Sequence, residues 1–332
     1  MSDLSYIWNK GKKLLGCEYA ILGGAMSWVS EHNLVAAISN AGGFGILACG
    51  SMPPQLLDKE IKATQALTSK PFGVNLITMH PELDQLIKTC KENNVTHVVL
   101  AGGLPKSYMI DALKESEIKV IAFAPALIIA KKLIKMGVDG IVIEGMEAGG
   151  HIGPVSTLVL AQEILPHLKD EVPIFVAGGI GRGEAIAQLL KMGAAGCQIG
   201  TRFVCADESI AHENFKNIFI RSQARNTTVS PQLDENFPVI PVRAIENKGT
   251  AEFIKAQRQA IEDYQSGKFS KEEAQLSIEK FWAGALKKAV IDGDVEHGSV
   301  MAGQSVGMVF NKQPVAEIIQ ELVEQTYSAY LK

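Results

Sequence analysis

The sequence predicts a (β/α)8 barrel of the TIM type with an appended C-terminal helical lobe. Eight short apolar runs that end in glycine or a polar turn recur through the first two thirds of the chain, with segments of helical periodicity between them. Parallel strands that are buried on both faces have this continuous apolar character. The alternative is a doubly wound open sheet, but that fold usually has about six or seven strands, and no GxGxxG motif opens the chain.

The expected strands begin about 21 to 33 residues apart, which is the spacing of βα units. They span residues 19–22, 44–48, 72–77, 97–101, 119–123, 140–143, 173–177 and 196–199. The helices between them are expected at residues 33–40, 54–68, 81–93, 106–116, 125–136, 156–166 and 183–192. Several end at a glycine, for example at Gly42 and Gly137, where the left-handed backbone of a helix C-cap costs little.

The pattern changes after Phe203. A polar, turn-rich stretch follows over residues 226–241, and helices are expected at about residues 251–266, 271–290 and 314–330. We therefore divide the chain into a barrel over residues 1–203 and a helical lobe over residues 204–332, whose glycine-rich segment 292–307 returns to the site. An apolar stripe at helical spacing predicts that the lobe packs on the barrel rim and covers its mouth, or else forms a dimer contact. The stripe comprises Ile278, Phe281, Trp282 and Ala285.

The composition excludes several classes of function. Of 332 residues, 47% are hydrophobic and 20% charged, which is not the composition of a disordered or collagen-like chain. With 32 basic and 36 acidic side chains the formal net charge is -4, so we expect a small-molecule partner and no nucleic acid. Five cysteines without a CxxC pair predict neither a disulfide framework nor a thiolate metal site. Without a signal peptide or an apolar run of about 20 residues, the protein is expected to be cytoplasmic and not to cross a membrane.

Two glycine loops predict a phosphate site. In a (β/α)8 barrel, function resides in the loops that follow the strands, and a phosphate often binds after strands seven and eight. Strand seven leads into Gly178 and Gly179, and strand eight into Gly200 and Thr201. Glycine lets backbone N–H groups approach an anion closely, and the Thr201 hydroxyl can donate a further hydrogen bond. Tight turns with no ligand are the alternative for either loop alone.

The loop after strand six presents the candidate catalytic residue, His151. It follows Glu144 and the run Ala148, Gly149 and Gly150, so a flexible glycine turn delivers the imidazole from a strand end to the barrel mouth. Proton transfer is the expected role, and a purely structural histidine is the alternative. We expect no metal, because no HxH or HExxH spacing accompanies it.

Small residues also line the loop after strand one. Gly23, Gly24, Ala25 and Met26 lie there, and Asn75 closes strand three with an amide that can donate and accept toward a heterocycle. A glycine-lined mouth, two phosphate loops and an amide favour a flat phosphorylated cofactor. Flavin mononucleotide (FMN) fits better than a sugar phosphate, which stays open on these grounds alone.

These residues together resemble the nitronate monooxygenase (2-nitropropane dioxygenase) family of flavin-dependent barrels, which includes the FMN-dependent enoyl-acyl-carrier-protein reductases. The resemblance covers nearly the whole chain. Six ordered motifs carry it: GGAM at 23–26, AGGFG at 41–45, PFGVN at 71–75, EGMEAGGH at 144–151, AGGI at 177–180 and GTRF at 200–203. The segments GDV at 293–295 and GSVMAGQ at 298–304, which include Met301 and Gln304, resemble the reductase branch.

The resemblance implies FMN as cofactor and a flavin-dependent oxidoreductase as function. It places the residues of the loop after strand one and Asn75 around the ring, both phosphate loops at the phosphate, and His151 at the reactive edge. The other expected cofactor-binding residues are Glu144, Ala148, Gly149, Gly150, Met301 and Gln304. In the monooxygenase branch the motif is expected to begin Gln-Gly, whereas this chain has Glu144-Gly145, as in the reductases.

Two reactions follow from the resemblance. The first is oxidation of alkyl nitronates by oxygen to a carbonyl compound and nitrite. The alternative is reduction of an enoyl thioester on acyl carrier protein, with NADH or NADPH as co-substrate. Both use the same residues around the flavin. A non-catalytic barrel that binds flavin or sugar phosphate is a second alternative, and a homodimer is possible for each.

Overall fold

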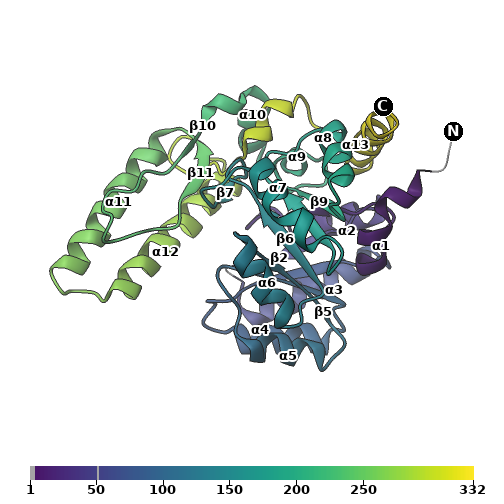
Figure 1. The fold of residues 1–332 in the computed structure, drawn as a ribbon. Helices are drawn as coiled ribbons and strands as arrows, with labels where there is room; N and C mark the ends of the chain where they lie inside the picture. The colour runs from purple at the N-terminus through teal and green to yellow at the C-terminus, as the bar shows by residue number, and fades with distance from the viewer. Residues whose placement is uncertain (1–3, 51) are drawn as a thin grey trace.

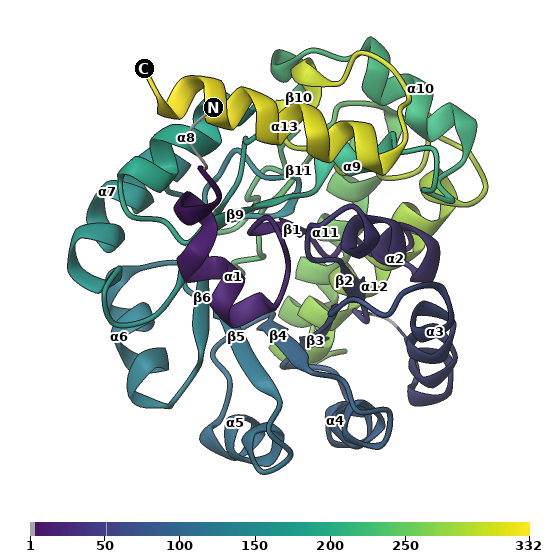
Figure 2. The same cartoon turned by 90° about the vertical axis from the view of Figure 1, so that its right-hand side faces the viewer.

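The computed structural model describes residues 4–50 and 52–332. Its centre is an eight-stranded parallel sheet in the order β1-β9-β8-β6-β5-β4-β3-β2. The strands are β1 (Ile21–Gly23), β2 (Ile46–Ala48), β3 (Gly73–Ile77), β4 (His97–Ala101), β5 (Lys119–Phe123), β6 (Gly140–Glu144), β8 (Ile174–Ala177) and β9 (Gly196–Ile199). A parallel bridge joins Leu22 of β1 to Phe44, two residues before β2, so the sheet closes (Figure 2). The predicted (β/α)8 barrel is confirmed, with all eight strands at the expected places.

Seven helices follow the first seven strands of this barrel and surround it (Figures 1 and 2). They are α2 (His32–Asn40), α3 (Pro54–Leu67), α4 (Leu83–Glu92), α5 (Ser107–Lys114), α6 (Leu127–Lys135), α7 (Thr157–Leu168) and α8 (Gly183–Lys191). Each turns apolar residues, such as Leu86 and Ile87 of α4, toward the strands. These helices match the sequence prediction to within two residues at each end, because their amphipathic period is a local property of the chain.

The N-terminal segment closes one end of the barrel. A 3-10 turn, η1 (Ser5–Trp8), leads into α1 (Asn9–Leu15), which crosses the amino ends of the strands (Figure 2). A side chain at Gly11 would lie 2.4 Å from Ala20 Cβ and 2.5 Å from the Ala195 carbonyl oxygen, so α1 packs closely against these strand ends. In the part of the chain that the structure describes, α1 thus covers the amino ends of the strands, and we expect the mouth of the barrel at their carboxyl ends.

Helix α13 (Val315–Tyr330) corrects the expected division of the chain at residue 203. We grouped it with the lobe, but it packs along α8 and also contacts α2, on the outside of the barrel (Figure 2). Gln325 Oε1 accepts a hydrogen bond from the Gly183 N–H at 2.8 Å, and a side chain at Gly183 would lie 2.1 Å from the Leu322 carbonyl oxygen. Because it fills the gap between the helices of the seventh and first units, α13 serves as the eighth barrel helix. The lobe is thus an insertion between β9 and α13.

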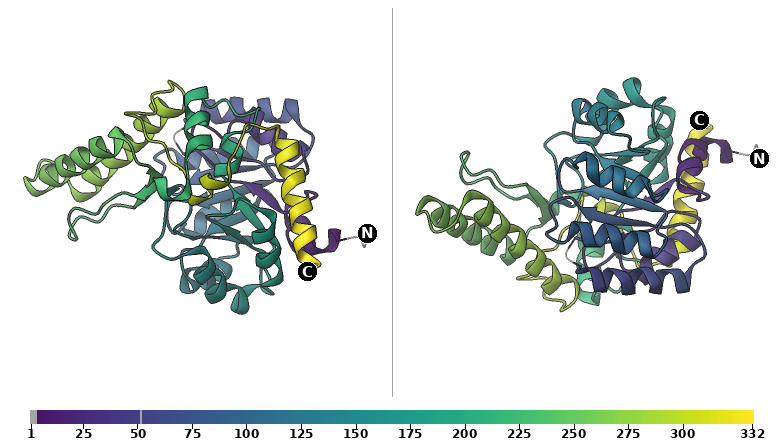
Figure 3. Two further views of the ribbon diagram at one scale, coloured as in Figure 1. Left: turned by 90° about the horizontal axis from the view of Figure 1, so that it is seen from above. Right: turned by 90° about the horizontal axis from the view of Figure 1, so that it is seen from below.

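This insertion contains a small sheet and a helical hairpin. It begins with α9 (Thr201–Val204), α10 (Glu213–Arg221) and η2 (Ala224–Asn226). The antiparallel strands β10 (Thr227–Val229) and β11 (Val242–Ile245) pair with each other, and β11 also pairs with β7 (Gly150–His151) from the barrel loop after β6. Helices α11 (Lys248–Gln265) and α12 (Lys271–Val290) project from the barrel as a hairpin, and η3 (Gln304–Met308) leads to α13 (Figures 1 and 3).

The predicted stripe of α12 packs within the hairpin, so the prediction that these residues lie on the barrel rim is wrong. Further along the same helix, Leu286, Ala289 and Val290 join the core of the barrel. The Trp282 and Phe253 rings stack with centroids 4.2 Å apart, and Ile278 is buried in the same cluster, together with Phe237 from the connection before β11. The stripe finds its apolar partner on α11 because the two helices are adjacent in the chain and antiparallel. A second small core therefore gives the lobe its own rigidity.

Candidate active site

The loop after β8 has the backbone that glycine permits. Gly178 and Gly179 have φ of 100° and 69°, in the left-handed region that other residues rarely adopt. A side chain at Gly178 would lie 2.7 Å from Thr157 Oγ1, and one at Gly179 would lie 2.8 Å from Glu147 Cβ. The N–H groups of this loop can therefore approach a ligand in a way that a side chain would prevent.

The loop after β6 is tied to the glycine loop by Glu147 and Thr157. The Glu147 carboxylate accepts hydrogen bonds from the Thr157 backbone N–H at 2.9 Å and from its hydroxyl at 2.8 Å. The same hydroxyl lies 3.0 Å from the Gly178 carbonyl oxygen. Sequence reasoning did not single out Thr157, because its partners are 10 and 21 residues away and no spacing rule connects them.

The loop after β1 meets the start of α9. The Gly24 N–H donates to the Ile199 carbonyl oxygen at 2.8 Å, and the Ser30 hydroxyl donates to the Gly24 carbonyl oxygen at 2.9 Å. A side chain at Gly200 would lie 3.3 Å from Met26 Sδ. The loop over residues 23–26, predicted to hold the flavin ring, thus lies beside Gly200, predicted to hold the phosphate.

The segment that precedes η3 returns to the same place. The Gly303 N–H donates to Thr201 Oγ1 at 3.1 Å, and the Gln304 N–H donates to the Glu147 carbonyl oxygen at 2.9 Å. Met301 Sδ lies 3.6 Å from where a side chain of Gly150 would begin, and Gly149 lies against the Ala302 backbone. Residues that are about 100 to 150 positions apart in the chain therefore form one wall.

Two of the predicted polar residues lie on barrel strands, Asn75 within β3 and Glu144 at the end of β6. The Asn75 amide donates to the Val99 carbonyl oxygen on the neighbouring strand at 3.0 Å, which fixes its orientation. Glu144 ends β6, and burial raises the pKa of its carboxyl to about 8. A carboxyl with this pKa is mostly protonated at neutral pH, so it donates as well as accepts hydrogen bonds. Gln198, which is buried on β9 beside Gly24, is a third such side chain that the sequence analysis did not consider.

His151 is not on a flexible turn. It forms β7 with Gly150 and pairs with Val242 of β11, and the Ile152 N–H donates to the Pro241 carbonyl oxygen at 3.0 Å. The ring is partly exposed, and its Nε2 lies 3.1 Å from Glu279 Oε2 of α12. The lobe therefore holds the backbone and the ring of His151, which a short sequence motif could not reveal.

Two buried arginines join segments around the site, and the guanidinium group of each is hydrogen-bonded to the protein. Arg243 of β11 donates from Nε to the Met146 carbonyl oxygen at 2.9 Å, and burial lowers the pKa of its guanidinium. Arg202 donates to the Met308 carbonyl oxygen at 3.0 Å and also pairs with Glu321 of α13. Arg202, the arginine of the GTR motif, thus joins α9, η3 and α13.

A separate ionisable cluster at the start of α2 has a structural explanation. His32 Nδ1 lies 2.8 Å from Glu60 Oε2 and 2.9 Å from Glu31 Oε2. Glu31 caps the helix by accepting from the Asn33 and Leu34 N–H groups, while Glu60 accepts from the His32 N–H at 3.1 Å. Three atoms that could bind a cation lie close together here. Both carboxylates already have structural partners, because Glu31 caps the start of α2 and Glu60 joins α3 to the first residue of α2.

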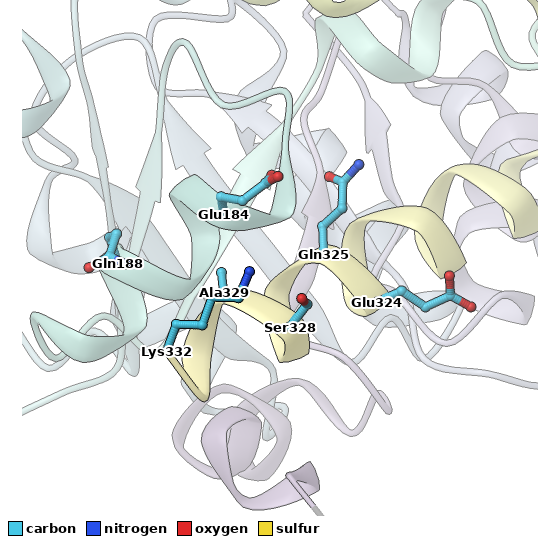
Figure 4. A pocket seen from close by; sticks show the side chains of 7 residues that line it. All are labelled: Glu184, Gln188, Glu324, Gln325, Ser328, Ala329 and Lys332. Carbon is cyan, nitrogen blue, oxygen red and sulfur yellow. The ribbon is translucent and has the colours of Figure 1, made fainter. Parts of the chain in front are cut away.

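A surface groove between α8 and α13 is remote from this arrangement. Figure 4 shows its lining, which includes Glu184, Gln188, Gln325 and Lys332. The groove is on the outer wall of the barrel, and none of the predicted site residues lines it. In the part of the chain that the structure describes, no helix is long and apolar enough to cross a membrane.

Comparison with known proteins decides the family. The family model for nitronate monooxygenase matches residues 9–94 and 83–325. The chain belongs to the nitronate monooxygenase family. It is accordingly a flavin-dependent oxidoreductase, as the resemblance of its motifs implied.

The relatives of the chain are named for different substrates. The chain is 29% identical to the (3aS,4S,5R,7aS)-5-hydroxy-7a-methyl-1-oxo-octahydro-1H-indene-4-carboxyl-CoA dehydrogenase of Rhodococcus jostii, over 94% of this chain and 93% of that one. It is 28% identical to a probable nitronate monooxygenase of Staphylococcus saprophyticus, over 94% and 96%. Among solved structures, FabK from Thermotoga maritima is 34% identical with a TM-score of 0.82, over 96% of this chain and 95% of FabK.

A nitroalkane oxidase from Streptomyces ansochromogenes, at 24% identity and a TM-score of 0.78, shares the fold. It covers 96% of this chain and 98% of its own. These likenesses extend over whole chains, so the lobe and α13 are common parts of the architecture.

Proposed function

We propose that this protein is an FMN-dependent reductase of enoyl thioesters that uses NADH or NADPH, of the enoyl-acyl-carrier-protein reductase type. The observation that carries the proposal is the position of the segment 298–304. Its sequence resembles the reductase branch, and its Met301, Gly303 and Gln304 lie against Gly150, Thr201 and Glu147. The reductase-type part of the chain is therefore a wall of the site and not a remote tail.

The residues fit FMN. Gly178, Gly179 and Gly200 leave backbone N–H groups accessible on two adjacent loops, and Thr201 accepts from Gly303, which leaves its hydroxyl hydrogen free to donate to a phosphate. No Rossmann fingerprint supplies a second phosphate site, which favours FMN over FAD. Protonated Glu144 adds no negative charge beside an uncharged ring system.

FMN, when bound, supplies the hydride chemistry that links the nicotinamide to the β-carbon of the enoyl thioester. One proton must then reach the α-carbon, so that hydride and proton together saturate the double bond. His151 is the group at the mouth that can donate it. Lys287 of α12 lies over the Trp28 ring at 5.2 Å, so the lobe also reaches the loop after β1.

The relatives support enoyl reduction as the first candidate and nitronate oxidation as the second. FabK is an enoyl-acyl-carrier-protein reductase, and the Rhodococcus relative is named for a CoA thioester. Nitronate oxidation is the second candidate, because the family model and the staphylococcal relatives carry that name. Sequence motifs alone ranked these two reactions in the opposite order.

The test is an anaerobic titration of the purified yellow enzyme. We expect NADH or NADPH to bleach the flavin absorbance and crotonyl-CoA, or a crotonyl acyl carrier protein, to restore it. Bleaching by propyl nitronate, with no response to either nicotinamide, would overturn the proposal in favour of the monooxygenase. A colourless protein that does not take up FMN would exclude both reactions.

A further inference from the structure

The lobe contributes a charged side chain to His151 that the family motifs do not include. Glu279 lies on α12, 128 residues after His151 in the chain, and its Oε2 is 3.1 Å from Nε2 of the imidazole. Both side chains are about two-fifths exposed, at 41% for His151 and 36% for Glu279, so this ion pair lies at the mouth and not in the core.

The position of Glu279 is set by the small core of the lobe. Its neighbour Ile278 and the residue one turn on, Trp282, are both buried, and Trp282 stacks on Phe253 of α11. A helix residue between two anchored positions has little freedom in its backbone. The Cα atom of Glu279 is therefore held in place, and only the side-chain torsions of Glu279 need to be ordered for the contact with His151.

His151 is held by the lobe at its backbone as well. Val242 pairs with His151 in the small sheet, and Arg243, the next residue of β11, donates to the Met146 carbonyl oxygen in the loop that leads to the histidine. Backbone, loop and ring are thus each fixed by residues of the insertion. The orientation of the ring thus depends on contacts that the barrel strands and helices do not supply.

We propose that Glu279 is a positioning residue for His151: its carboxylate pairs with Nε2 of the protonated imidazole and holds the ring so that Nδ1 donates its proton to the substrate. The inference rests on the proposed role of His151 in proton transfer. A proton donor must face the substrate when the substrate arrives, and a carboxylate 3.1 Å from Nε2 limits rotation of the ring.

A double-mutant cycle tests the proposal on the holoenzyme. Glu279→Gln should lower kcat about two- to fivefold, the range expected when an exposed ion pair is lost, and leave KM for NADH nearly unchanged. In a His151→Asn background the same substitution should have no further effect, because the group through which it acts is gone. Glu279→Asp should recover part of the rate. Glu272→Gln, which removes a carboxylate from an exposed position on the same helix, is the matched control and should keep full activity.

A spectroscopic readout separates positioning from support of the fold. Ring nitrogen shifts of His151, measured by NMR on protein labelled with 15N-histidine and assigned with His151→Asn, should move in Glu279→Gln and not in Glu272→Gln. Equal losses of rate in both backgrounds, or an unmoved His151 signal, would overturn the inference. If the wild type oxidises propyl nitronate and does not reduce crotonyl-CoA, the proposed function fails, and the same cycle measured on the nitronate still decides the role of Glu279.

Discussion

Replacement of Glu144 by glutamine should make the protein more stable at alkaline pH. Burial raises the pKa of this carboxyl from 4.5 to about 8, so the folded protein keeps it protonated over a range in which the unfolded chain loses the proton. The folded state then binds more protons than the unfolded state, and the free energy of unfolding falls as pH rises between these two values. Glutamine does not titrate and has nearly the shape of a protonated glutamic acid.

The magnitude follows from the two pKa values. Each pH unit between them is worth about 1.4 kcal/mol, so the full difference from 4.5 to about 8 corresponds to an upper limit of about 5 kcal/mol. Between pH 5 and pH 8 the wild type should lose up to about 4 kcal/mol relative to Glu144→Gln. Water that enters the barrel mouth reduces this figure, but it does not change its sign.

The assay is urea denaturation of flavin-free protein at several pH values, because bound flavin would add its own contribution to the stability of the folded state. Glu163→Gln on the exposed face of α7 is the control and should leave the pH dependence of the wild type unchanged. Infrared spectra should show a protonated carboxyl band at pH 7 in the wild type that is absent from Glu144→Gln. Parallel plots of unfolding free energy against pH for wild type and variant would refute the reasoning.

Three further outcomes are expected. His151→Asn should keep the flavin spectrum and lower the rate by about 10² to 10⁴, as stopped-flow reoxidation by substrate would show; an apoprotein or a fully active variant would contradict the assigned role. Gly179→Asp should abolish FMN binding through its clash with Glu147 and its charge, whereas Thr201→Ala should weaken binding by about 1 kcal/mol in fluorescence titrations; equal affinities would remove the phosphate loops from the site. Truncation after Phe203 should yield insoluble or flavin-free protein, because it removes α13 from its seat on Gly183; a soluble, yellow truncation would show that the eighth helix is dispensable.

The sequence by itself determined the barrel and its order of units. Strands and helices follow from hydrophobic period, and each depends on neighbours within about ten residues, so 97–101 and 271–290 were predicted with the bounds that the structure has. Local motifs likewise predicted the glycine loops after β8 and β9 and the loop that carries His151. The motifs of these loops also sufficed to indicate the family.

Only the tertiary structure decided what the residues after Phe203 do. Helical period shows that a helix has an apolar face but not which surface will cover it, so α13 was assigned to the lobe although it completes the barrel, and the stripe of α12 was assigned to the rim although it packs on α11. The neutral state of Glu144 and the contact of Glu279 with His151 likewise depend on groups far apart in the chain. Burial and long-range contact arise from the folded arrangement as a whole, and no local pattern encodes them.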